Sequence, residues 1–466
     1  MLTYSFENRN GLSLYEYLYT CIKEDILSFR LAPDEKLPSK RALAKNLDIS
    51  IITVESAYGQ LMAEGYIYSV PKSGFYVSHI ASAVELREKD NKTSEEEVSN
   101  NTEAFFADFV KNNTASDNFP FATWTKLMRE TMSDERQKLM VSSPGQGIYE
   151  LRKAIADYLF EFRGMKVSAD RIIIGAGTEY LYSLIIQLLG RDKRYALEDP
   201  GYRKIHHIYK ANEVDCVHVP LDSQGIDISM LEKSKADVLH ISPSHHFPTG
   251  IVTPVSRRYE LLSWASKSKG RYIIEDEYDS EFRLLGKPIP SLQSIDVLEK
   301  VIYINTFSKS LTPTIRISYM VLPEALMKKY NEKLSFYSCT VANFEQYTLA
   351  SFIKKGHFEK HINRMRNFYR NQRDSMMETI KSHPLYERVT VTEENSGLHF
   401  LLSVQTDLSD EELMKKTKKN GVNVSCLSQY YSQKGNGKEH TLIINYSGIE
   451  KDKMKEAVER LFEAVL

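Results

Sequence analysis

The stretch NTFSKSLTPTIRISYM, residues 305–320, places a single lysine among small hydroxyl residues. Lys309 lies between Ser308 and Ser310 after a short apolar run, and Arg316 follows seven positions later. A lysine amine forms Schiff bases with aldehydes, and hydroxyl and guanidinium groups hold phosphate. The stretch therefore predicts a site for an aldehyde cofactor that carries a phosphate, although a surface lysine after an edge strand would leave the same pattern.

The stretch IIEDEYD, residues 273–279, ends an apolar run with Asp276 and Tyr278. A carboxylate in an apolar setting can keep a pyridine nitrogen protonated, because opposite charges favour the charged form of both partners. A tyrosine hydroxyl beside it can reach the phenolic oxygen of the same ring. These two residues favour a pyridine-ring cofactor, and the alternative is an ordinary acidic loop after a parallel strand.

Two further stretches have features of a cofactor site. In GAGTE, residues 175–179, the backbone N–H groups around Gly177 and the Thr178 hydroxyl can bind a phosphate at the positive end of a helix. In LEDPGYRK, residues 197–204, the ring of Tyr202 can stack on a flat cofactor. A glycine turn that only serves packing and a core tyrosine are the alternatives.

These motifs lie at the ends of apolar strands that alternate with helices. The strands are RIIIGAG, RYALED, DVLHISP, RYIIEDEY, KVIYINTFSKS and ISYMVLP. Alternation of strand and helix predicts an α/β domain with a mostly parallel sheet, in which ligands bind at the carboxyl ends of the strands. From about Phe336 onward, helices and a last pair of strands predict a smaller C-terminal lobe.

The N-terminal part of the chain has the pattern of a winged helix-turn-helix. Residues 12–29 have the apolar spacing of an amphipathic helix. Ser39 can cap a second helix from Lys40, and Ser50 can cap a third helix that ends at Gly65. Two short helices joined by a tight turn predict a DNA-binding module, and the strands around the following PKSG turn predict its wing.

We expect three parts along the 466 residues, which exceed what one core usually serves. They are a winged helix-turn-helix domain over residues 1–80, a flexible linker over 81–118 and an α/β domain over 119–466. The linker segment ELREKDNKTSEEEVSNNTE is charged and poor in apolar residues, so it cannot bury enough surface to become ordered. Its far end, AFFADFV, could dock on the α/β domain.

The composition of the chain bears on where the protein resides and on how it could bind DNA or metal. The net charge of −1 gives no bulk attraction to nucleic acid, so DNA binding needs a local patch. The four cysteines form no CxxC pair and have no histidine at zinc-finger spacing, which indicates free thiols and no metal site. Neither a signal peptide nor an apolar run of membrane-spanning length is visible, so we expect a soluble cytoplasmic protein.

The order of the motifs is more specific than any one of them. GAGT, EDPGY, SPSHHFPTG, EDEYDSEF and TFSKS follow one another as in the fold-type-I aminotransferases, which use pyridoxal 5′-phosphate. From LPSKRALAKNL to FSKSLTPTIRISYMVLP, with only the linker unmatched, the chain resembles the MocR/GabR-type regulators of the GntR superfamily. The resemblance implies a winged helix-turn-helix fused to an aminotransferase-like domain, a head-to-tail homodimer, and a ligand sensed through the cofactor.

The resemblance also implies a role for each candidate cofactor residue. Lys309 would form the Schiff base, Asp276 would hold the pyridinium nitrogen, and Tyr278 would reach O3′ of the ring. Tyr202 would stack on the ring. The phosphate would be held by Gly177, Thr178, Ser308 and Arg316.

The ligand end departs from the family pattern. In the GABA-responsive member two arginines hold the ligand's carboxylate, but here Lys204 stands at the first position, with Arg203 beside it. Residues 445–450 contain no arginine at the second position. A lysine binds a carboxylate without the bidentate fork of arginine, so we do not expect GABA itself. His246 stands where the family usually has glutamine, and the candidate ligand-binding residues are Arg203, Lys204 and His246.

The DNA-binding module also departs from the family. Its recognition helix begins with Ile51 and Ile52 where related helices usually carry an arginine, and residues 1–80 contain eight Lys and Arg against nine Asp and Glu. Candidate phosphate contacts, which position a protein without reading sequence, are Lys36, Ser39, Lys40, Arg41, Lys45 and Lys72. Thr53 and Ser56 could contact base edges. The alternative is a degenerate module that only dimerises.

These observations predict a cytoplasmic, dimeric transcriptional regulator that depends on pyridoxal phosphate. Its partners would be a double-stranded DNA operator and a small amine or amino-acid effector, or pyridoxal phosphate itself, and any transaminase activity would be residual. The rival is a working aminotransferase with an accessory N-terminal domain, which shares every cofactor residue. The N-terminal module and the missing carboxylate arginine favour the regulator.

Overall fold

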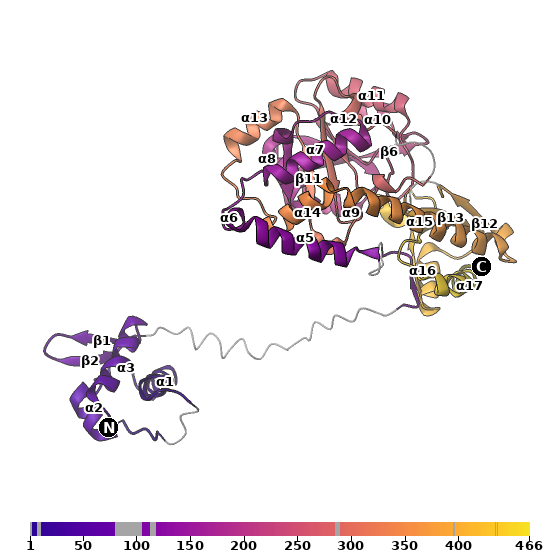
Figure 1. The fold of residues 1–466 in the computed structure, drawn as a ribbon. Helices are drawn as coiled ribbons and strands as arrows, with labels where there is room; N and C mark the ends of the chain where they lie inside the picture. The colour runs from indigo at the N-terminus through magenta and orange to yellow at the C-terminus, as the bar shows by residue number, and fades with distance from the viewer. Residues whose placement is uncertain are drawn as a thin grey trace. The chain divides into compact units, whose positions relative to one another are not determined.

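The chain separates into two compact units, Met1–Thr102 and Glu103–Leu466, and each is described by itself. In a computed structural model of the protein, drawn in Figure 1, the described residues are 2–6, 11–79, 105–111, 118–284, 289–394, 397–433, 435 and 437–466. Most of the predicted linker, residues 81–118, lies outside these ranges. Within them, no helix is both long and apolar enough to cross a membrane.

The N-terminal unit consists of three helices and a two-stranded antiparallel wing. Its elements are α1 (Leu14–Leu27), α2 (Lys40–Leu47), α3 (Ile51–Ala63), β1 (Ile67–Val70) and β2 (Gly74–Val77). The Ser39 side chain caps α2 by accepting a hydrogen bond from the backbone of Ala42. Ser50 caps α3 in the same way from the backbone of Thr53. The predicted winged helix-turn-helix is therefore confirmed, together with both of its caps.

One apolar core holds this unit together. Val54 and Tyr58 of α3 are fully buried and share a core with Leu18 of α1. Residues three or four positions apart share one face of a helix, so this spacing turns the apolar side of α3 inward. The N-terminal end of α3 leaves Ile51 and Ile52 exposed to solvent.

The second unit is built around an eight-stranded sheet. In spatial order its strands are β4 (Ile172–Gly175), β11 (Ser318–Val321), β10 (Val301–Thr306), β9 (Tyr272–Asp276), β8 (Val238–Ile241), β5 (Arg194–Asp199), β6 (Asp215–Asp222) and β7 (Gly225–Ile226). From β10 to β6 all neighbours are parallel. Strand β11 runs antiparallel to both of its neighbours, and β7 runs antiparallel to β6. The mostly parallel sheet predicted from the sequence is confirmed.

Helices cover both faces of this sheet, which explains why its strands are apolar on both sides. The described helices are α5 (Phe121–Asp134), α6 (Arg136–Leu139), α7 (Tyr149–Arg163), α8 (Thr178–Leu189), α9 (Arg203–Ala211), α10 (Ile228–Lys233), α11 (Val255–Ser266), α12 (Leu292–Ile295), α13 (Glu324–Lys333), α14 (Asn343–Lys354), α15 (His357–Ser382), α16 (Asp410–Lys419) and α17 (Met454–Val465). Helices α5, α7 and α14 lie side by side (Figure 1). Ile172 and Ile174 of β4 share a core with α7 and α14, whereas Ile173 faces a second core with α8.

The C-terminal part of the chain forms the smaller lobe that the sequence predicted. Strands β12 (Val389–Thr392), β13 (His399–Val404), β16 (Thr441–Asn445) and β15 (Ser425–Cys426) form an antiparallel sheet. Helices α16 and α17 pack together in this lobe, drawn in yellow in Figure 1.

A short strand joins the stretch before the α/β region to this lobe. Strand β3 (Ala107–Asp108) pairs in parallel with β14 (Val422–Asn423), and the backbone N–H of Phe109 donates to the Asn423 carbonyl at 2.9 Å. Phe109 is almost completely buried. The docking predicted for AFFADFV is confirmed. The second unit therefore includes residues 105–111, which composition alone assigned to the linker, because burying Phe109 and forming backbone hydrogen bonds offsets the entropy of ordering them.

Candidate functional site

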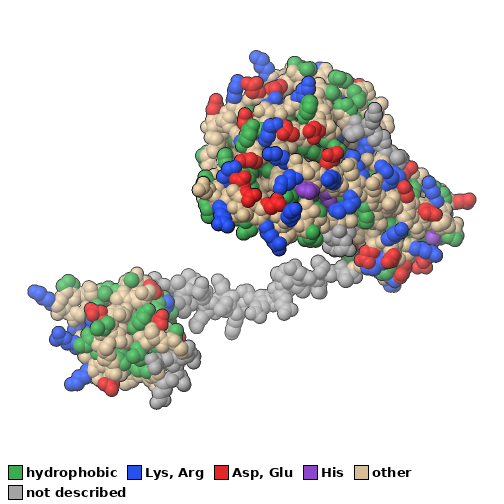
Figure 2. Space-filling model, viewed as in Figure 1, with side chains coloured by type: hydrophobic (Ala, Val, Ile, Leu, Met, Phe, Trp, Pro, Cys, Tyr) green, Lys and Arg blue, Asp and Glu red, His purple; other side chains and the backbone are tan. Residues whose placement is uncertain are grey.

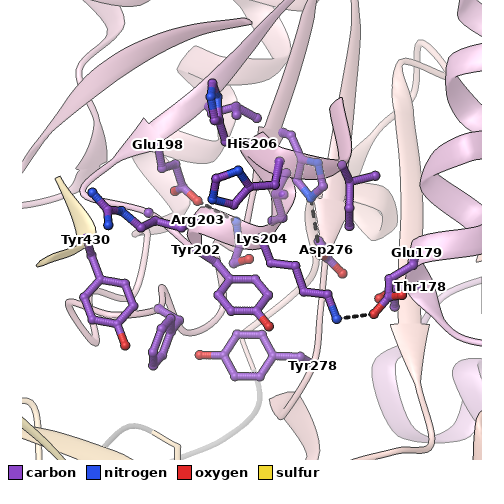
Figure 3. Close-up of a pocket in the computed structure, with 18 of the residues that line it drawn as sticks. Thr178, Glu179, Glu198, Tyr202, Arg203, Lys204, His206, Asp276, Tyr278 and Tyr430 are labelled. Atoms are coloured by element: carbon purple, nitrogen blue, oxygen red, sulfur yellow. Dashed lines mark hydrogen bonds and ion pairs between the residues drawn. The ribbon is translucent and has the colours of Figure 1, made fainter. Parts of the chain in front are cut away.

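The carboxyl ends of the central parallel strands open into a cavity of about 810 Å³. Of the residues predicted to bind cofactor or ligand, those that line it are Thr178, Tyr202, Arg203, Lys204, Asp276, Tyr278, Ser308, Lys309 and Arg316. Figure 3 shows several of them converging from separate elements. Residues that lie more than a hundred positions apart in the chain are thus brought into one site, at the sheet edge where α/β folds bind ligands.

Lys309 lies in the turn that follows β10. Burial lowers the pKa of its amine to about 8, and the negative charge of Asp279 opposes this shift. A larger fraction of the amine is therefore neutral near pH 7 than for an exposed lysine, whose pKa is about 10.4. The neutral amine is the form that attacks an aldehyde, so this environment suits Schiff-base formation.

Asp276, the last residue of β9, is buried and has two polar partners that the sequence motifs did not indicate. Tyr182 of α8 donates a hydrogen bond to its Oδ2, and Nε2 of His240 lies 3.2 Å from the same oxygen. Nδ1 of His240 lies in turn 2.6 Å from the hydroxyl of Tyr209. Such partners stabilise a buried carboxylate that could hold a protonated ring nitrogen. A histidine within the apolar strand DVLHI was the available sequence signal.

Tyr278 follows Asp276 by two residues, and its side chain lines the cavity. Burial raises the pKa of its hydroxyl well above the usual value of about 10, so the group stays protonated. Its Oη lies 3.2 Å from Nδ1 of His245, which lies 2.8 Å from Oδ2 of Asp279. The rings of Tyr278 and Tyr202 both project into the cavity (Figure 3).

The start of α8 and the guanidinium of Arg316 form the end of the cavity that suits a phosphate. Gly177 has a φ of +93°, and a Cβ at this position would lie 2.3 Å from Nη2 of Arg316. Arg316 therefore lies directly against the positive N-terminus of α8, where Thr178 begins the helix. The Ser308 hydroxyl accepts a hydrogen bond from Oγ1 of Thr306 at 3.0 Å. Helix end, hydroxyls and cation together match what phosphate binding requires.

The two predicted ligand cations have different surroundings. Lys204 forms an ion pair with Glu179, which also lies 3.9 Å from Nη2 of Arg316. Arg203 donates to the carbonyl of Tyr431 at 3.5 Å, the limit of a hydrogen bond. Figure 3 shows Lys204 directed toward Glu179 and Arg203 on the side of Tyr430. The charge of Lys204 is thus compensated by a carboxylate of the cavity wall, whereas Arg203 contacts a neutral carbonyl.

His246 is buried behind the cavity wall and is not among the described residues that line it. Its Nε2 lies 3.5 Å from Oε2 of Glu198, and its Nδ1 lies 2.7 Å from Oγ1 of Thr249. Burial lowers the pKa of His246 to about 3 and raises the pKa of Glu198 to about 8, so both groups are neutral at pH 7. Glu198 lines the cavity and was missed, although it stands in the EDPGY motif.

The segment that follows the predicted linker also contributes to the cavity wall. Phe109 and Val110 line the cavity, and the carbonyl of Phe109 accepts a hydrogen bond from the backbone of Asn445 at 3.1 Å. Asn445, at the end of β16, lines the cavity as well. Sequence reasoning missed this contribution, because composition does not show which strand a short segment will pair with.

The predicted DNA-contacting residues of the N-terminal unit differ in their exposure and in their polar partners. Lys36, Arg41, Lys45, Ser56 and Lys72 are exposed, and basic side chains project from this unit in Figure 2. Lys40 forms an ion pair with Glu55 at 2.6 Å, so part of its charge is compensated. The Thr53 hydroxyl oxygen lies 2.9 Å from the Ser50 hydroxyl oxygen, and the Ser39 side chain caps α2. Ile52, with 73% of its surface exposed, offers an apolar contact for a thymine methyl.

Two family models match the two units. The model of aminotransferase class I and II matches residues 110–461, and the model of bacterial regulatory proteins, gntR family, matches residues 14–77. The kynurenine aminotransferase of Pyrococcus horikoshii, solved in complex with PMP, is similar to this chain with a TM-score of 0.67 and 24% identity. The similarity covers 82% of this chain and 94% of that enzyme, which shows the fold.

Two relatives are similar over nearly the whole chain. The uncharacterized HTH-type transcriptional regulator YdeL of Bacillus subtilis (strain 168) is 39% identical over 98% of this chain and 98% of its own length. The HTH-type pyridoxine biosynthesis transcriptional regulator PdxR of Corynebacterium glutamicum is 28% identical over 93% of this chain and 92% of its own.

Fold, cavity and N-terminal unit together define a helix-turn-helix transcriptional regulator with an aminotransferase-like domain that takes pyridoxal 5′-phosphate as its cofactor. The side chains at the cavity fit that cofactor, because a buried lysine, a buried carboxylate and a phosphate cradle line the same space. The chain belongs to the GntR family and, within it, to the MocR/GabR type.

Proposed function

We propose that this regulator senses a small amine, an amino acid or a vitamin B6 compound through pyridoxal phosphate bound to Lys309, and that the ligand changes its binding to an operator. The observation that carries the proposal is the buried amine of Lys309, with its pKa of about 8, in a cavity that also holds the buried Asp276. The same chain carries the winged helix-turn-helix. A vitamin B6 ligand is included because a relative is named for pyridoxine biosynthesis.

The proposal gives each candidate cofactor residue a role. Bound pyridoxal phosphate supplies an aldehyde that reacts with amines and a ring that withdraws electrons. Lys309 supplies the amine that binds it, Asp276 holds the proton on the ring nitrogen, and Tyr278 donates a hydrogen bond to the phenolic oxygen. The ring of Tyr202 covers a face of the cofactor. Its phosphate is held by Gly177, Thr178, Ser308 and Arg316.

The remaining space of the cavity is where we place the effector. Arg203 supplies a cation for an acidic group of the ligand, and Lys204 can do so only if it leaves Glu179. His246 does not line the cavity, so it would affect ligand binding only indirectly, through its contact with Glu198. An acid ligand that displaced Glu179 would separate two paired charges, so we expect Arg203 to contribute more to ligand affinity than Lys204.

The position of Phe109 and Val110 supports a route from ligand to DNA-binding unit. Both residues line the cavity and lie a few positions beyond the stretch that joins the two units. A ligand that contacts them acts on the chain next to that junction. Asn445 connects the same segment to the last strand of the C-terminal lobe.

We further propose a cytoplasmic, head-to-tail homodimer that binds double-stranded operator DNA through Lys36, Ser39, Lys40, Arg41, Lys45, Thr53, Ser56 and Lys72. Large apolar side chains that a second copy could cover support the dimer. Met140, Val141 and Phe336 are each at least 65% exposed. The segments that carry them are neighbours, because a Cβ at Gly145 would lie 2.4 Å from the carbonyl oxygen of Tyr337.

The test of the proposed function is a titration of the full-length, cofactor-loaded protein with a panel of amines, amino acids and vitamin B6 compounds. Absorbance reports reaction at the cofactor, and gel shifts with the promoter DNA of its own operon report operator binding. We expect at least one compound to change both signals. DNA binding that is independent of every compound and of pyridoxal phosphate would contradict the sensing role, and steady turnover of amino and keto acids would favour the enzyme.

Replacing Asp276 tests its role at the ring nitrogen. We expect Asp276→Asn to weaken binding of pyridoxal phosphate roughly tenfold or more and to change the spectrum of the bound cofactor. The reason is that a protonated ring nitrogen loses its opposite charge, and one unit of pKa corresponds to a factor of ten in proton affinity. Equilibrium dialysis and absorbance measure both effects. The exposed Asp452→Asn is the control, and unchanged affinity and spectrum would place Asp276 outside the site.

Replacing Gly177 tests the phosphate cradle. A methyl group at this position would force the Arg316 guanidinium aside, because the Cβ would lie 2.3 Å from Nη2. We expect Gly177→Ala to weaken binding of pyridoxal phosphate roughly tenfold, since one charge-assisted hydrogen bond contributes about 1.5–3 kcal/mol. Binding of pyridoxal, which lacks the phosphate, should change little.

The control for Gly177→Ala is Gly164→Ala. Gly164 also has a positive φ, +66°, but a Cβ there meets nothing within 4 Å. Its backbone lies in the left-handed region, with φ 66° and ψ 16°, so the control introduces an alanine at a positive φ without the contact to Arg316. If Gly177→Ala weakened pyridoxal and pyridoxal phosphate equally, the phosphate would not lie at this end of the cavity.

A further inference from the structure

One nitrogen of a buried histidine faces two oxygen groups beside the cavity. His245 lies in the loop after β8 and is 4% exposed. Its Nδ1 is 2.8 Å from Oδ2 of Asp279 and 3.2 Å from the hydroxyl oxygen of Tyr278. A ring nitrogen carries either one hydrogen or one lone pair, so it cannot donate to one of these groups and accept from the other.

The charge of Asp279 decides which state Nδ1 adopts. An ionised carboxylate has no hydrogen to give, so the 2.8 Å contact requires a hydrogen on Nδ1 of His245. This holds for the neutral ring and for the protonated ring alike. The oxygen of Tyr278 can then only accept from that nitrogen. Its own hydrogen is left to point elsewhere, and the cavity lies on its other side.

The surroundings of the second ring nitrogen agree with this assignment. Nε2 of His245 is buried, with no hydrogen-bond partner among the described residues. The side chain of His245 also helps to line a small space of about 20 Å³, which is enough for one water molecule. Ser244, Arg163 and Arg283 line the same space and offer hydrogen-bond donors. A neutral ring with its hydrogen on Nδ1 has its acceptor lone pair on Nε2, which suits a water molecule or a donor in this space.

Tight packing holds the histidine in this position. A Cβ at Gly397 would lie 1.9 Å from Cε1 of His245 and 2.6 Å from Oδ2 of Asp279. The ring of His399 packs against that of His245 at a tilt of 36°, with 4.6 Å between centroids. The backbone before β13 thus packs tightly against both His245 and Asp279, and neither side chain can turn away without a rearrangement of the small lobe.

Other charged or titratable groups around His245 are the carboxyl group of Glu393, the rings of His246 and His399, and the guanidinium groups of Arg163 and Arg283. Burial raises the pKa of Glu393, and its electrostatic interaction with His245 opposes that shift. Burial also lowers the pKa of His399 well below its usual value, so this ring stays neutral at neutral pH. Among these groups and Asp279, the carboxyl group of Asp279 is the one within hydrogen-bond distance of Nδ1.

We propose that His245, fixed by Asp279, is a positioning residue that makes Tyr278 a hydrogen-bond donor toward the cavity. The inference rests on the proposed function, in which the phenolic oxygen of pyridoxal phosphate is the acceptor there. With the hydrogen on Nε2 instead, Tyr278 would donate to His245 and turn a lone pair toward the cofactor. His245 and Asp279 would not touch the cofactor themselves. They would decide whether Tyr278 acts as donor or acceptor in its hydrogen bond to the cofactor.

The hydrogen position can be measured without the cofactor. In full-length protein labelled with ¹⁵N-histidine, the signals of His245 are assigned by their loss in His245→Gln. We expect its Nδ1 to carry a hydrogen in the wild type. We expect Asp279→Asn to move the hydrogen to Nε2, because the amide donates to Nδ1. A wild-type ring with hydrogen only on Nε2 would overturn the proposal, even if pyridoxal phosphate binds as expected.

The effect on Tyr278 is measured with the cofactor bound. In a Schiff base with pyridoxal phosphate, the phenolic oxygen would also accept a hydrogen bond from the protonated imine. A second donor to this oxygen would compete with that hydrogen bond, so it would lower the pKa of the imine. We expect Tyr278→Phe to raise that pKa by about one unit, a tenfold change in proton affinity. His245→Gln should raise it in the same direction, and the double variant should be no higher than Tyr278→Phe alone.

The double variant separates this mechanism from a simple charge effect. If His245→Gln shifted the titration as much with Phe at position 278 as with Tyr, His245 would act on the cofactor through space and the proposal would be wrong. His440→Gln, in the C-terminal lobe, is the control and should leave the titration unchanged. Absence of any coloured adduct in the wild type would contradict the proposed function, while the ¹⁵N measurement would still test the position of the hydrogen.

Discussion

Lys309→Ala is expected to abolish the coloured, borohydride-reducible adduct between this protein and pyridoxal phosphate. The amine of Lys309 lies at the cavity with a pKa lowered to about 8, which favours its reaction with an aldehyde over that of exposed lysines. Reduction with borohydride, digestion and mass spectrometry of the modified peptide identify the site. We expect modified protein to fall by about a hundredfold or more in the variant, because the neutral amine is the reacting group.

The control for this experiment is Lys210→Ala. Lys210 is exposed on α9, the same helix that contributes to the cavity wall, but it is not among the described lining residues. A reducible adduct that survived Lys309→Ala with unchanged yield and spectrum would show that another lysine binds the cofactor.

The same lysine predicts how adduct formation depends on pH. The pKa of Lys309 is lowered, so the neutral amine becomes abundant as the pH rises toward 8, and the protonated amine dominates below it. The rate at which the cofactor-free protein binds pyridoxal phosphate should therefore rise with pH up to about 8 and then level off. Stopped-flow absorbance measures it.

Operator binding is expected to need two DNA-binding units. Residues 1–80 contain eight Lys and Arg, and Lys40 is already paired with Glu55, so one unit neutralises few phosphates. A second unit in the proposed dimer binds at an effective concentration in the millimolar range, which increases affinity by about 10² to 10⁴. On the same basis, we expect the full chain to bind DNA with two half-sites about a hundredfold or more tightly than DNA with one.

Gel shifts at several salt concentrations measure this difference, with residues 1–80 as the single-unit comparison. That unit has its own core, which should let it fold alone. Lys36→Ala should reduce the slope of log affinity against log salt by about one for each phosphate that the protein no longer neutralises. Lys23→Ala is the control, because its amine pairs with Glu64. Tight and specific binding of a single half-site by residues 1–80 would contradict the expected need for a dimer.

Much of the fold was predictable because its signals are local. The caps at Ser39 and Ser50, the spacing of Val54 and Tyr58 and the apolar strands all depend on interactions within a few residues of the chain. That several candidate cofactor residues line one cavity was predictable for a related reason. A motif that ends a parallel strand is carried by the strand to one edge of the sheet, so Asp276 and the turn with Lys309 had to meet there.

The surroundings of those residues were not predictable in the same way. Tyr182 lies 94 positions from Asp276, and Lys204 lies 25 positions from Glu179. His246 was expected at the ligand but is buried behind Glu198. Single-sequence patterns fix which face of an element is apolar, but they do not fix which polar groups from different elements share an interior.

The sequence by itself therefore determined a winged helix-turn-helix, an α/β domain and the set of side chains at the strand ends. The tertiary structure alone decided that β11 lies between β4 and β10, and that β3 pairs with β14, where Asp108 meets Asn423 at a separation of 315 positions. It also decided that Phe109 lines the cavity. The physical reason is that strand pairing and burial of these segments depend on contacts between distant parts of the chain, whose closure is favourable only once the rest of the domain has folded.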